Sequence, residues 1–289
     1  MDDFKEKLAQ YRDDVNSALE KAIPANGEEA VDAMRYSVFA GGKRIRAALV
    51  LAFCELFGGN KEKALPFACA IEMIHTYSLI YDDLPCMDND TLRRGKPTNH
   101  VVFGESTALM AGAGLYARAF ETVSGSKALS DSQKLEGISV LLNASGINGI
   151  ITGQMLDLKN RPGLSESEVM RIHKLKTSAM IEASALLGCI ASDCGPAEKE
   201  KARKYAENIG LAFQIKDDIL DVEGSVEALG KTVGKDKTEM KTTFVDILGV
   251  ENSQKQVDAL SAAAKNEMSD IQGSEFLCSL SDYLAGRKS

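Results

Sequence analysis

Residues 75–100 read HTYSLIYDDLPCMDNDTLRRGKPTNH, which places four carboxylates within nine positions directly after an apolar stretch. The four are Asp82, Asp83, Asp88 and Asp90. Residues 68–75 have the pattern of a buried helix, so the acids begin where that helix is expected to end. A solvated acidic loop is the commoner explanation of such a cluster by itself. However, like charges beside apolar surface are costly unless a cation shares the site, and carboxylate oxygens suit Mg²⁺.

A second acidic cluster lies in residues 213–221, FQIKDDILD. Asp217 and Asp221 stand at i and i+4 and therefore share one face of a helix, with Asp218 beside them and Gln214 one turn earlier. The remaining positions are largely apolar, which indicates a second buried helix that ends in acid. Two such helices are hard to explain by solvation. Together they indicate a site for divalent metal ions and a diphosphate.

The two clusters resemble the two aspartate-rich motifs of trans-prenyl diphosphate synthases. DDLPCMD (82–88) has the DDxxxxD form of the first motif, and DDILD (217–221) resembles the second. Further stretches follow in the order of that family: GGKRIR (41–46), EMIHTYS (72–78), RRGKPTNHVVFGE (93–105), GQMLDL (153–158), HKLKTSAMI (173–181) and LGKTVGKD (229–236). The similarity covers most of the chain and is greatest to the bacterial-type farnesyl diphosphate synthases (geranyltranstransferases). It implies an all-α, single-domain, isoprenoid-synthase-like helical bundle around a central cavity.

The resemblance implies a prenyltransferase that condenses an allylic diphosphate (dimethylallyl or geranyl) with isopentenyl diphosphate, head to tail, giving mainly farnesyl diphosphate and releasing diphosphate. The implied cofactor is Mg²⁺, as three ions, with Mn²⁺ as a substitute. The implied metal ligands are Asp82, Asp88 and Asp217, and the catalytic set adds Asp83, Asp218, Asp221 and Lys176. The residues implied for the allylic diphosphate are Arg93, Lys176, Thr177, Gln214 and Lys231, with Lys235 and Lys241 assisting. Those implied for isopentenyl diphosphate are Lys43, Arg46, His75 and Arg94.

The length of the product is expected to depend on Tyr77 and Ser78, one helical turn before Asp82. A growing isoprenoid tail is apolar, so it must extend away from the ions into a cavity between helices. An aromatic ring five positions before the first aspartate resembles family members that stop at fifteen carbons. A geranylgeranyl or geranyl diphosphate synthase is the alternative, and Tyr77 is otherwise a plain core aromatic.

Four positions depart from the family pattern: Tyr81, Thr91, Ala47 and Ala113. None of them removes an implied metal or diphosphate contact, so we expect catalysis to be intact. A class I terpene cyclase would carry a different second metal motif. A non-catalytic partner subunit of a heteromeric prenyl synthase would typically have lost one acidic motif.

The composition predicts one domain spanning residues 1–289, because no linker or low-complexity run divides the chain. The net charge of −8 argues against nucleic acid as a partner. Six cysteines without a CxxC pair indicate reduced thiols; Cys86, inside the first motif, receives no role. No apolar run is long enough to span a membrane, and no export signal is visible, so we expect a cytoplasmic protein. A homodimer is the family expectation.

Hydrophobic periodicity predicts about ten or more helices and no alternating strand of useful length. The expected helical ranges are 3–22, 28–39, 46–57, 63–83, 106–123, 130–158, 165–192 and 197–222. Ser165 and Glu168 form an expected capping box, and Pro85 is expected to distort the helix that bears the first motif. Residues 224–236 are predicted to form a loop. A weaker helical region follows, with breaks at Gly249 and Gly273.

Overall fold

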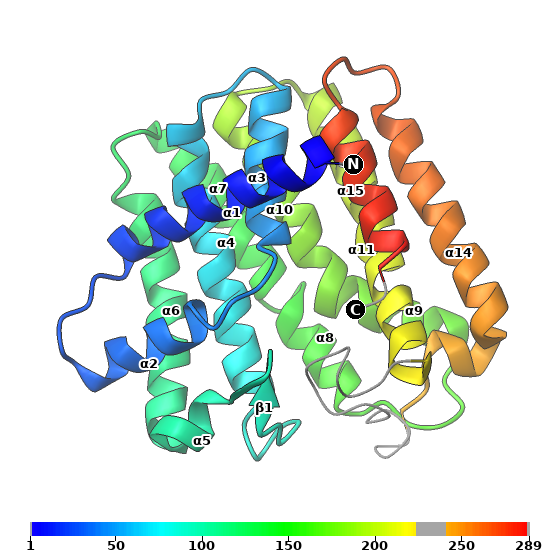
Figure 1. The fold of residues 1–289 in the computed structure, drawn as a ribbon, viewed down its shortest axis with the longest axis horizontal. Helices are drawn as coiled ribbons and strands as arrows, with labels where there is room; N and C mark the ends of the chain where they lie inside the picture. Colours follow the sequence, from blue (N-terminus) through cyan, green and yellow to red (C-terminus); the bar gives the residue numbers. More distant parts are fainter. Residues whose placement is uncertain (1, 224–240, 288–289) are drawn as a thin grey trace.

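The computed structural model describes residues 2–223 and 241–287, which form a single bundle of α-helices with one very short hairpin (Figure 1). The helices are α1 (Asp2–Ala22), α2 (Glu29–Val38), α3 (Ile45–Leu56), α4 (Lys61–Asp82), α5 (Asn99–Phe103), α6 (Glu105–Ser124), α7 (Asp131–Ser145), α8 (Ile150–Asp157), α9 (Glu166–His173), α10 (Ala179–Ser192), α11 (Pro196–Glu223), α14 (Phe244–Met268) and α15 (Glu275–Ala285). A π-helical turn, η1 (Lys174–Ser178), joins α9 to α10. The all-α prediction is confirmed.

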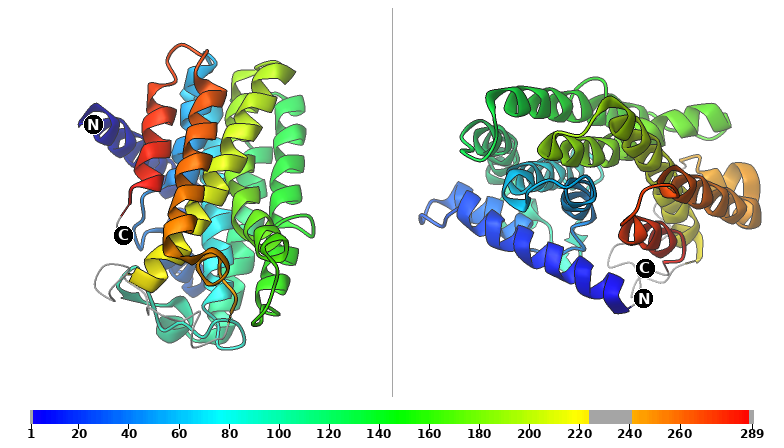
Figure 2. Two further views of the ribbon diagram at one scale, coloured as in Figure 1. Left: turned by 90° about the vertical axis from the view of Figure 1, so that its right-hand side faces the viewer. Right: turned by 90° about the horizontal axis from the view of Figure 1, so that it is seen from above.

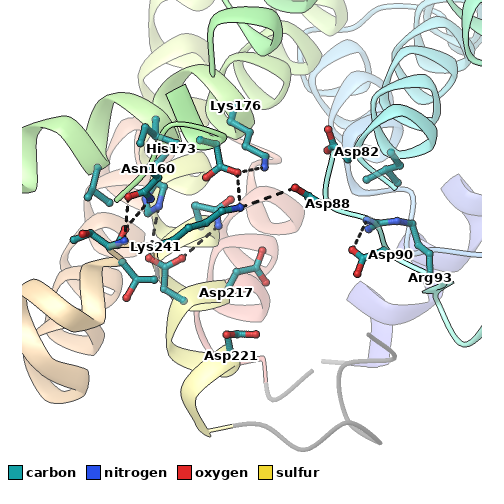
Figure 3. Close-up of a pocket in the computed structure, with 18 residues that line it drawn as sticks. Asp82, Asp88, Asp90, Arg93, Asn160, His173, Lys176, Asp217, Asp221 and Lys241 are labelled. Carbon is teal, nitrogen blue, oxygen red and sulfur yellow. Dashed lines mark hydrogen bonds and ion pairs between the residues drawn. The ribbon is translucent and has the colours of Figure 1, made fainter. Parts of the chain in front are cut away.

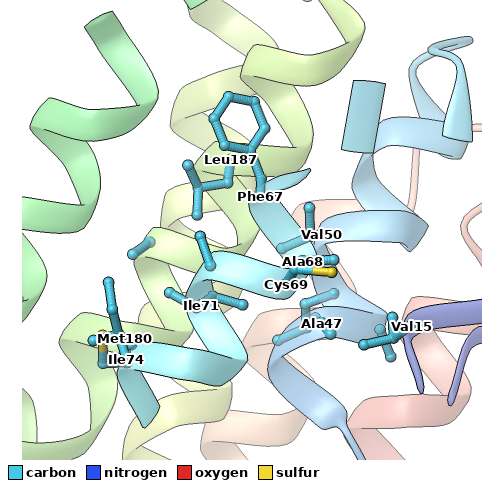
Figure 4. Close-up of a cluster of buried hydrophobic side chains, with 14 of the residues drawn as sticks. Val15, Ala47, Val50, Phe67, Ala68, Cys69, Ile71, Ile74, Met180 and Leu187 are labelled. Atoms are coloured by element: carbon cyan, nitrogen blue, oxygen red, sulfur yellow. The ribbon is translucent and has the colours of Figure 1, made fainter. Parts of the chain in front are cut away.

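Helix α4 lies at the centre of the bundle and packs against α3, α6 and α10. Its residues are apolar around most of the helix, which is the pattern of a helix enclosed by neighbours. Phe67 and Ile71 are fully buried there, and Figure 4 shows them near Val50 of α3 and Leu187 of α10. The first acidic motif therefore begins at the end of a rigid core helix.

Most of the expected helix ends are found in the structure. The Ser165–Glu168 capping box is present at the start of α9, and Thr243 with Asp246 forms another at the start of α14. Helix α4 ends at Asp82, before Pro85, and Gly249 interrupts α14 with φ 74° and ψ 161°. The expected break at Gly273 also lies between two helices.

The prediction of one continuous helix over residues 130–158 is wrong. Helix α7 ends at Ser145, and α8 begins only at Ile150. The chain turns sharply between them, and a Cβ atom at Gly149 would overlap the carbonyl oxygen of Ala144. The turn thus depends on a glycine that hydrophobic periodicity alone does not mark as a helix break.

The two acidic motifs come together because α4 and α11 end at the same end of the bundle (Figures 1 and 2). At that end lies the hairpin of β1 (Leu92–Arg93) and β2 (Lys96–Pro97), joined by Arg94 and Gly95 with φ of 54° and 73°. These strands are two residues long, so within the described ranges no strand of useful length contradicts the prediction. The predicted loop at 224–236, with Lys231 and Lys235, lies outside the described residues. None of the described helices combines the length and the apolar character needed to cross a membrane.

Candidate active site

A cavity of about 240 Å³ separates the two acidic motifs (Figure 3). Asp82, Asp88 and Asp90 line it from the side of α4, and Asp217 and Asp221 line it from α11. The pKa of Asp82 is raised to about 6, mainly by burial; Lys176 opposes this shift, and the nearby charge of Asp88 adds to it. Without a bound cation, the buried position of Asp82 therefore disfavours its charged form.

The carboxylates of this cavity fit a divalent ion that a substrate helps to bind. Among the described residues, no three His, Cys, Asp or Glu side chains are already close enough to hold one ion. Mg²⁺, however, commonly takes only one or two protein carboxylates and completes its shell with water and substrate phosphate oxygens. Asp82 and Asp88 on one wall and Asp217 on the other offer such oxygens.

Asp83 has a different environment from the other acids of its motif. It is buried and accepts hydrogen bonds from Arg93, whose Nε lies 2.8 Å from Oδ1 and whose Nη2 lies 2.5 Å from the same atom. Burial alone would lower the pKa of Arg93, but Asp83 outweighs burial and raises it. Arg93 still lines the cavity, so Asp83 fixes the guanidinium at the edge of the acidic walls.

Asp157 lines the same cavity, although the sequence analysis assigned it no role. Its Oδ2 lies 2.7 Å from Nζ of Lys176, on the π-helical turn, and 3.2 Å from Nζ of Lys241. Lys241 also lies 4.0 Å from Asp88 Oδ1. One signal could have pointed to Asp157, namely its place within the motif GQMLDL (153–158). The motif contains no positively charged residue, so it did not reveal the two lysines that contact Asp157.

Asp218 is buried in the wall of the first cavity and is engaged by several groups. The backbone N–H of Phe244 donates to its Oδ2 at 3.0 Å, and His173 Nε2 lies 3.6 Å from the same oxygen. Gln214 Nε2 lies 3.5 Å from Oδ1, and Thr177 Oγ1 donates to Gln214 at 2.7 Å. Asp218 therefore joins α11 to the start of α14.

A second cavity, of about 330 Å³, is lined by four basic residues that the sequence grouped together: Lys43, Arg46, His75 and Arg94. Burial keeps the pKa of His75 well below its ordinary value, and the positive charges of Arg46 and Arg94 lower it further. His75 Nε2 lies 3.4 Å from Arg46 Nη1. The cavity therefore presents strong positive charge beside a neutral imidazole, which suits an anionic ligand.

The second cavity contains two more arginines that the sequence analysis did not assign, Arg44 and Arg287. Arg287, directly after α15, lines it and donates through Nη2 to Asp217 Oδ1 at 2.7 Å. Nothing in the sequence linked this residue near the end of the chain to the second acidic motif. Gly42 borders the same cavity, and two features require a glycine there. Its φ is 121°, and the Cβ atom of any other residue would lie 2.9 Å from Cζ of Arg94.

Tyr77 belongs to a row of aromatic rings between α4 and α6. Its centroid lies 4.7 Å from that of Tyr81 and 5.1 Å from that of Tyr116, and Tyr116 lies 5.0 Å from Phe120. Tyr81 donates to the Leu109 carbonyl oxygen at 3.2 Å, so it packs on α6. Ser78, beside Tyr77, bonds to the backbone oxygen of His75.

Comparisons with known proteins agree with the motifs over almost the whole chain. The polyprenyl synthetase family model matches residues 28–279. A chloroplastic geranylgeranyl pyrophosphate synthase of Capsicum annuum is 45% identical, covering 98% of this chain and 79% of that protein. An FPP/GFPP synthase of Zymomonas mobilis superposes with a TM-score of 0.88 at 36% identity, covering 98% and 99%. A geranyltransferase of Helicobacter pylori, complexed with magnesium and isoprenyl diphosphate, gives 0.83 at 31% identity, covering 96% of each chain.

Proposed function

The chain belongs to the polyprenyl synthetase family as a trans-prenyltransferase, and on this premise we propose that it joins an allylic diphosphate to isopentenyl diphosphate in a Mg²⁺-dependent reaction. The observation that carries the proposal is the pair of adjoining cavities. One is walled by two sets of aspartates, the other is lined by basic residues, and Asp217 borders both. Two diphosphates could thus lie side by side, one with metal ions and one without.

In the first cavity the C–O bond of the allylic diphosphate breaks, and its electron pair leaves with the diphosphate oxygen. Bound Mg²⁺ supplies Lewis-acid stabilisation of that charge. Arg93 and Lys176 line the same cavity and stabilise the developing anion through fixed positive charges. The carboxylates themselves would hold the ions, with Asp82 and Asp88 on one wall and Asp217 on the other.

In the second cavity Lys43, Arg46 and Arg94 bind the diphosphate of isopentenyl diphosphate. Its double bond then donates an electron pair to the allylic cation, which forms the new C–C bond and leaves a tertiary cation. A proton is lost from the neighbouring carbon, and the departing diphosphate accepts it. These reaction steps need no dedicated side-chain base. The lowered pKa of His75 keeps its imidazole neutral, which agrees with a hydrogen-bonding role.

The relatives support geranylgeranyl diphosphate as the product more strongly than the farnesyl diphosphate expected from the sequence. The curated proteins of Capsicum annuum and of Arabidopsis thaliana, the latter 44% identical over 99% of this chain, carry that name. Farnesyl diphosphate remains the second candidate because of the aromatic row at Tyr77, which narrows the space between α4 and α6. The names of both relatives place those proteins in chloroplasts, so the expected cytoplasmic location is not confirmed.

We also propose a homodimer through α6, α7 and α8. Helix α7 packs against both α6 and α8. Large apolar side chains are exposed on these helices and on the turn between α7 and α8: Met110, Leu135, Leu142, Ile147, Ile151 and Met155. Apolar surface of this extent is typical of a subunit interface. Light scattering should give twice the chain mass, and Ile147→Asp should lower that mass.

The activity can be tested with purified protein, geranyl diphosphate, labelled isopentenyl diphosphate and Mg²⁺. Label should pass into an extractable prenyl product, and excess chelator should abolish the transfer. Chromatography after dephosphorylation then separates fifteen-carbon from twenty-carbon products. A terpene cyclase would consume the allylic diphosphate without incorporating label, and a non-catalytic subunit would incorporate none. Either result would refute the proposal.

A further inference from the structure

Arg287 lines the second cavity and is paired with Asp217, the carboxylate that borders both cavities. Its side chain is 9% exposed, and Nη2 donates at 2.7 Å both to Asp217 Oδ1 and to the carbonyl oxygen of Phe213. The guanidinium lies 3.8 Å above the Phe213 ring. Its Nε is buried without a hydrogen-bond partner among the described residues. The side chain is thus held at Asp217 while one of its donors is unused.

The unused donor is matched by another in the same cavity. Nε of Arg46 is also buried and has no partner within the described ranges. Both guanidinium groups line the second cavity, and although their Nε atoms are buried away from it, their positive charges favour an anionic ligand there. Asp217 and Glu72 also line this cavity and offset part of the positive charge, and Asp217 is the one that also borders the first cavity.

Asp217 has two competing uses. Arg287 contacts only Oδ1 of Asp217, but a metal ion bound to this carboxylate in the first cavity would compete for the same negative charge and weaken that contact. Loss of that contact would leave the positive charge of Arg287 unbalanced and facing the second cavity. Positive charge there favours a diphosphate.

We propose that Arg287 is an exchangeable counter-ion that couples the two cavities. It neutralises Asp217 while no metal is bound, and it strengthens the binding of isopentenyl diphosphate once a metal ion occupies Asp217. The inference rests on the proposed function, because it takes the second cavity as the isopentenyl diphosphate site. Coupling of this kind is reciprocal, so isopentenyl diphosphate must equally favour the metal.

The test measures isopentenyl diphosphate binding by calorimetry in chelator, where no turnover occurs. Asp217→Asn should bind the ligand about five- to tenfold more tightly than wild type, although it loses activity. Asp221→Asn is the matched control. Asp221 lies one helical turn from Asp217 and carries the same charge, but it lines only the first cavity. It should show no comparable gain. The double variant Asp217→Asn with Arg287→Gln should lose the gain.

Arg287→Gln alone gives a second readout in the opposite direction. It should bind Mg²⁺ more tightly than wild type and isopentenyl diphosphate more weakly, whereas a merely structural arginine would weaken both. Asp217→Asn and Arg287→Gln change different residues and give separate readouts, so the test does not depend on the correct folding of one variant.

Equal gains in Asp217→Asn and Asp221→Asn, or a gain that survives in the double variant, would overturn the coupling alone. Absence of isopentenyl diphosphate binding in every variant, with and without Mg²⁺, would instead refute the proposed function, and the coupling with it.

Discussion

Lys176 Nζ lies 2.7 Å from Oδ2 of Asp157, and Lys241 Nζ reaches the same oxygen at 3.2 Å. Burial would raise the pKa of Asp157, but the two lysines outweigh burial and lower it. Lys241 is fixed from a second side, because the amide of Asn160 exchanges two 3.0 Å hydrogen bonds with the backbone of Thr242. One carboxylate thus orients two ammonium groups toward the first cavity.

Asp157→Asn should therefore impair the use of the allylic substrate indirectly, through Lys176 and Lys241. We expect kcat/KM for geranyl diphosphate to fall about tenfold to a hundredfold, because two lysines lose the partner that orients them. Unfolding free energy should fall by about 1–3 kcal/mol for the same reason. Steady-state kinetics and urea unfolding check both effects. Asp131→Asn, which removes a fully exposed acid, is the control. Unchanged allylic kinetics in Asp157→Asn would contradict the orienting role.

The raised pKa of Asp82 predicts how the metal-free protein responds to pH. With a folded pKa of about 6 and an unfolded value near 3.9, the protonated form stabilises the fold. That contribution is fully present below about pH 4 and is lost as the pH rises through 6. Asp82→Asn should consequently stabilise the chelated protein by about 1–3 kcal/mol at pH 8 and by almost nothing at pH 4. Urea unfolding at the two pH values measures this difference. A destabilised Asp82→Asn at pH 8 would show that the carboxylate is well compensated without metal.

The sequence predicted the helical architecture because apolar periodicity and helix caps are local signals. The capping box at Ser165 needs only residues within one turn of each other, and it is present in the structure. The break between α7 and α8 was missed because it depends on backbone crowding at Gly149, which an apolar pattern does not report. The π-helical turn at Lys176 was missed for a similar reason, since periodicity cannot separate it from an α-helix.

At the site, motif residues could be assigned to two cavities, but their partners could not. Arg93 and Asp83 are ten positions apart and form a pair that only the turn after α4 creates. Arg287 and Asp217 are separated by 70 positions. Such pairs arise from tertiary packing, for which a single sequence carries no signal. For this reason Arg93 was assigned to the allylic diphosphate alone, whereas the structure also gives it the task of holding Asp83.

Variants of the basic residues should separate the two substrates. Arg94→Ala and Lys43→Ala should raise the KM for isopentenyl diphosphate, because both residues line the second cavity. Lys176→Ala should instead impair the allylic substrate, because Lys176 lines the first. Each substitution should weaken the binding free energy of its diphosphate substrate by about 2–5 kcal/mol if the charged contact with the bound anion is buried. Initial-rate kinetics with each substrate varied in turn give the two KM values. The same profile for all three variants would show that the two cavities do not bind separate diphosphates.

Product length should respond to Tyr77, the ring one turn before Asp82. It packs on Tyr81 and Tyr116, so its removal opens space between α4 and α6 along the direction in which α4 leads away from the carboxylates. Tyr77→Ala should shift the product to longer chains than wild type makes, whether wild type stops at fifteen or twenty carbons, because the apolar tail fills the vacated space. Tyr77→Phe keeps the ring and should leave the product unchanged. Chromatography of the dephosphorylated products measures the shift. If Tyr77→Ala and Tyr77→Phe give the same product as wild type, the chain end must contact another wall, and Tyr77 is a core aromatic.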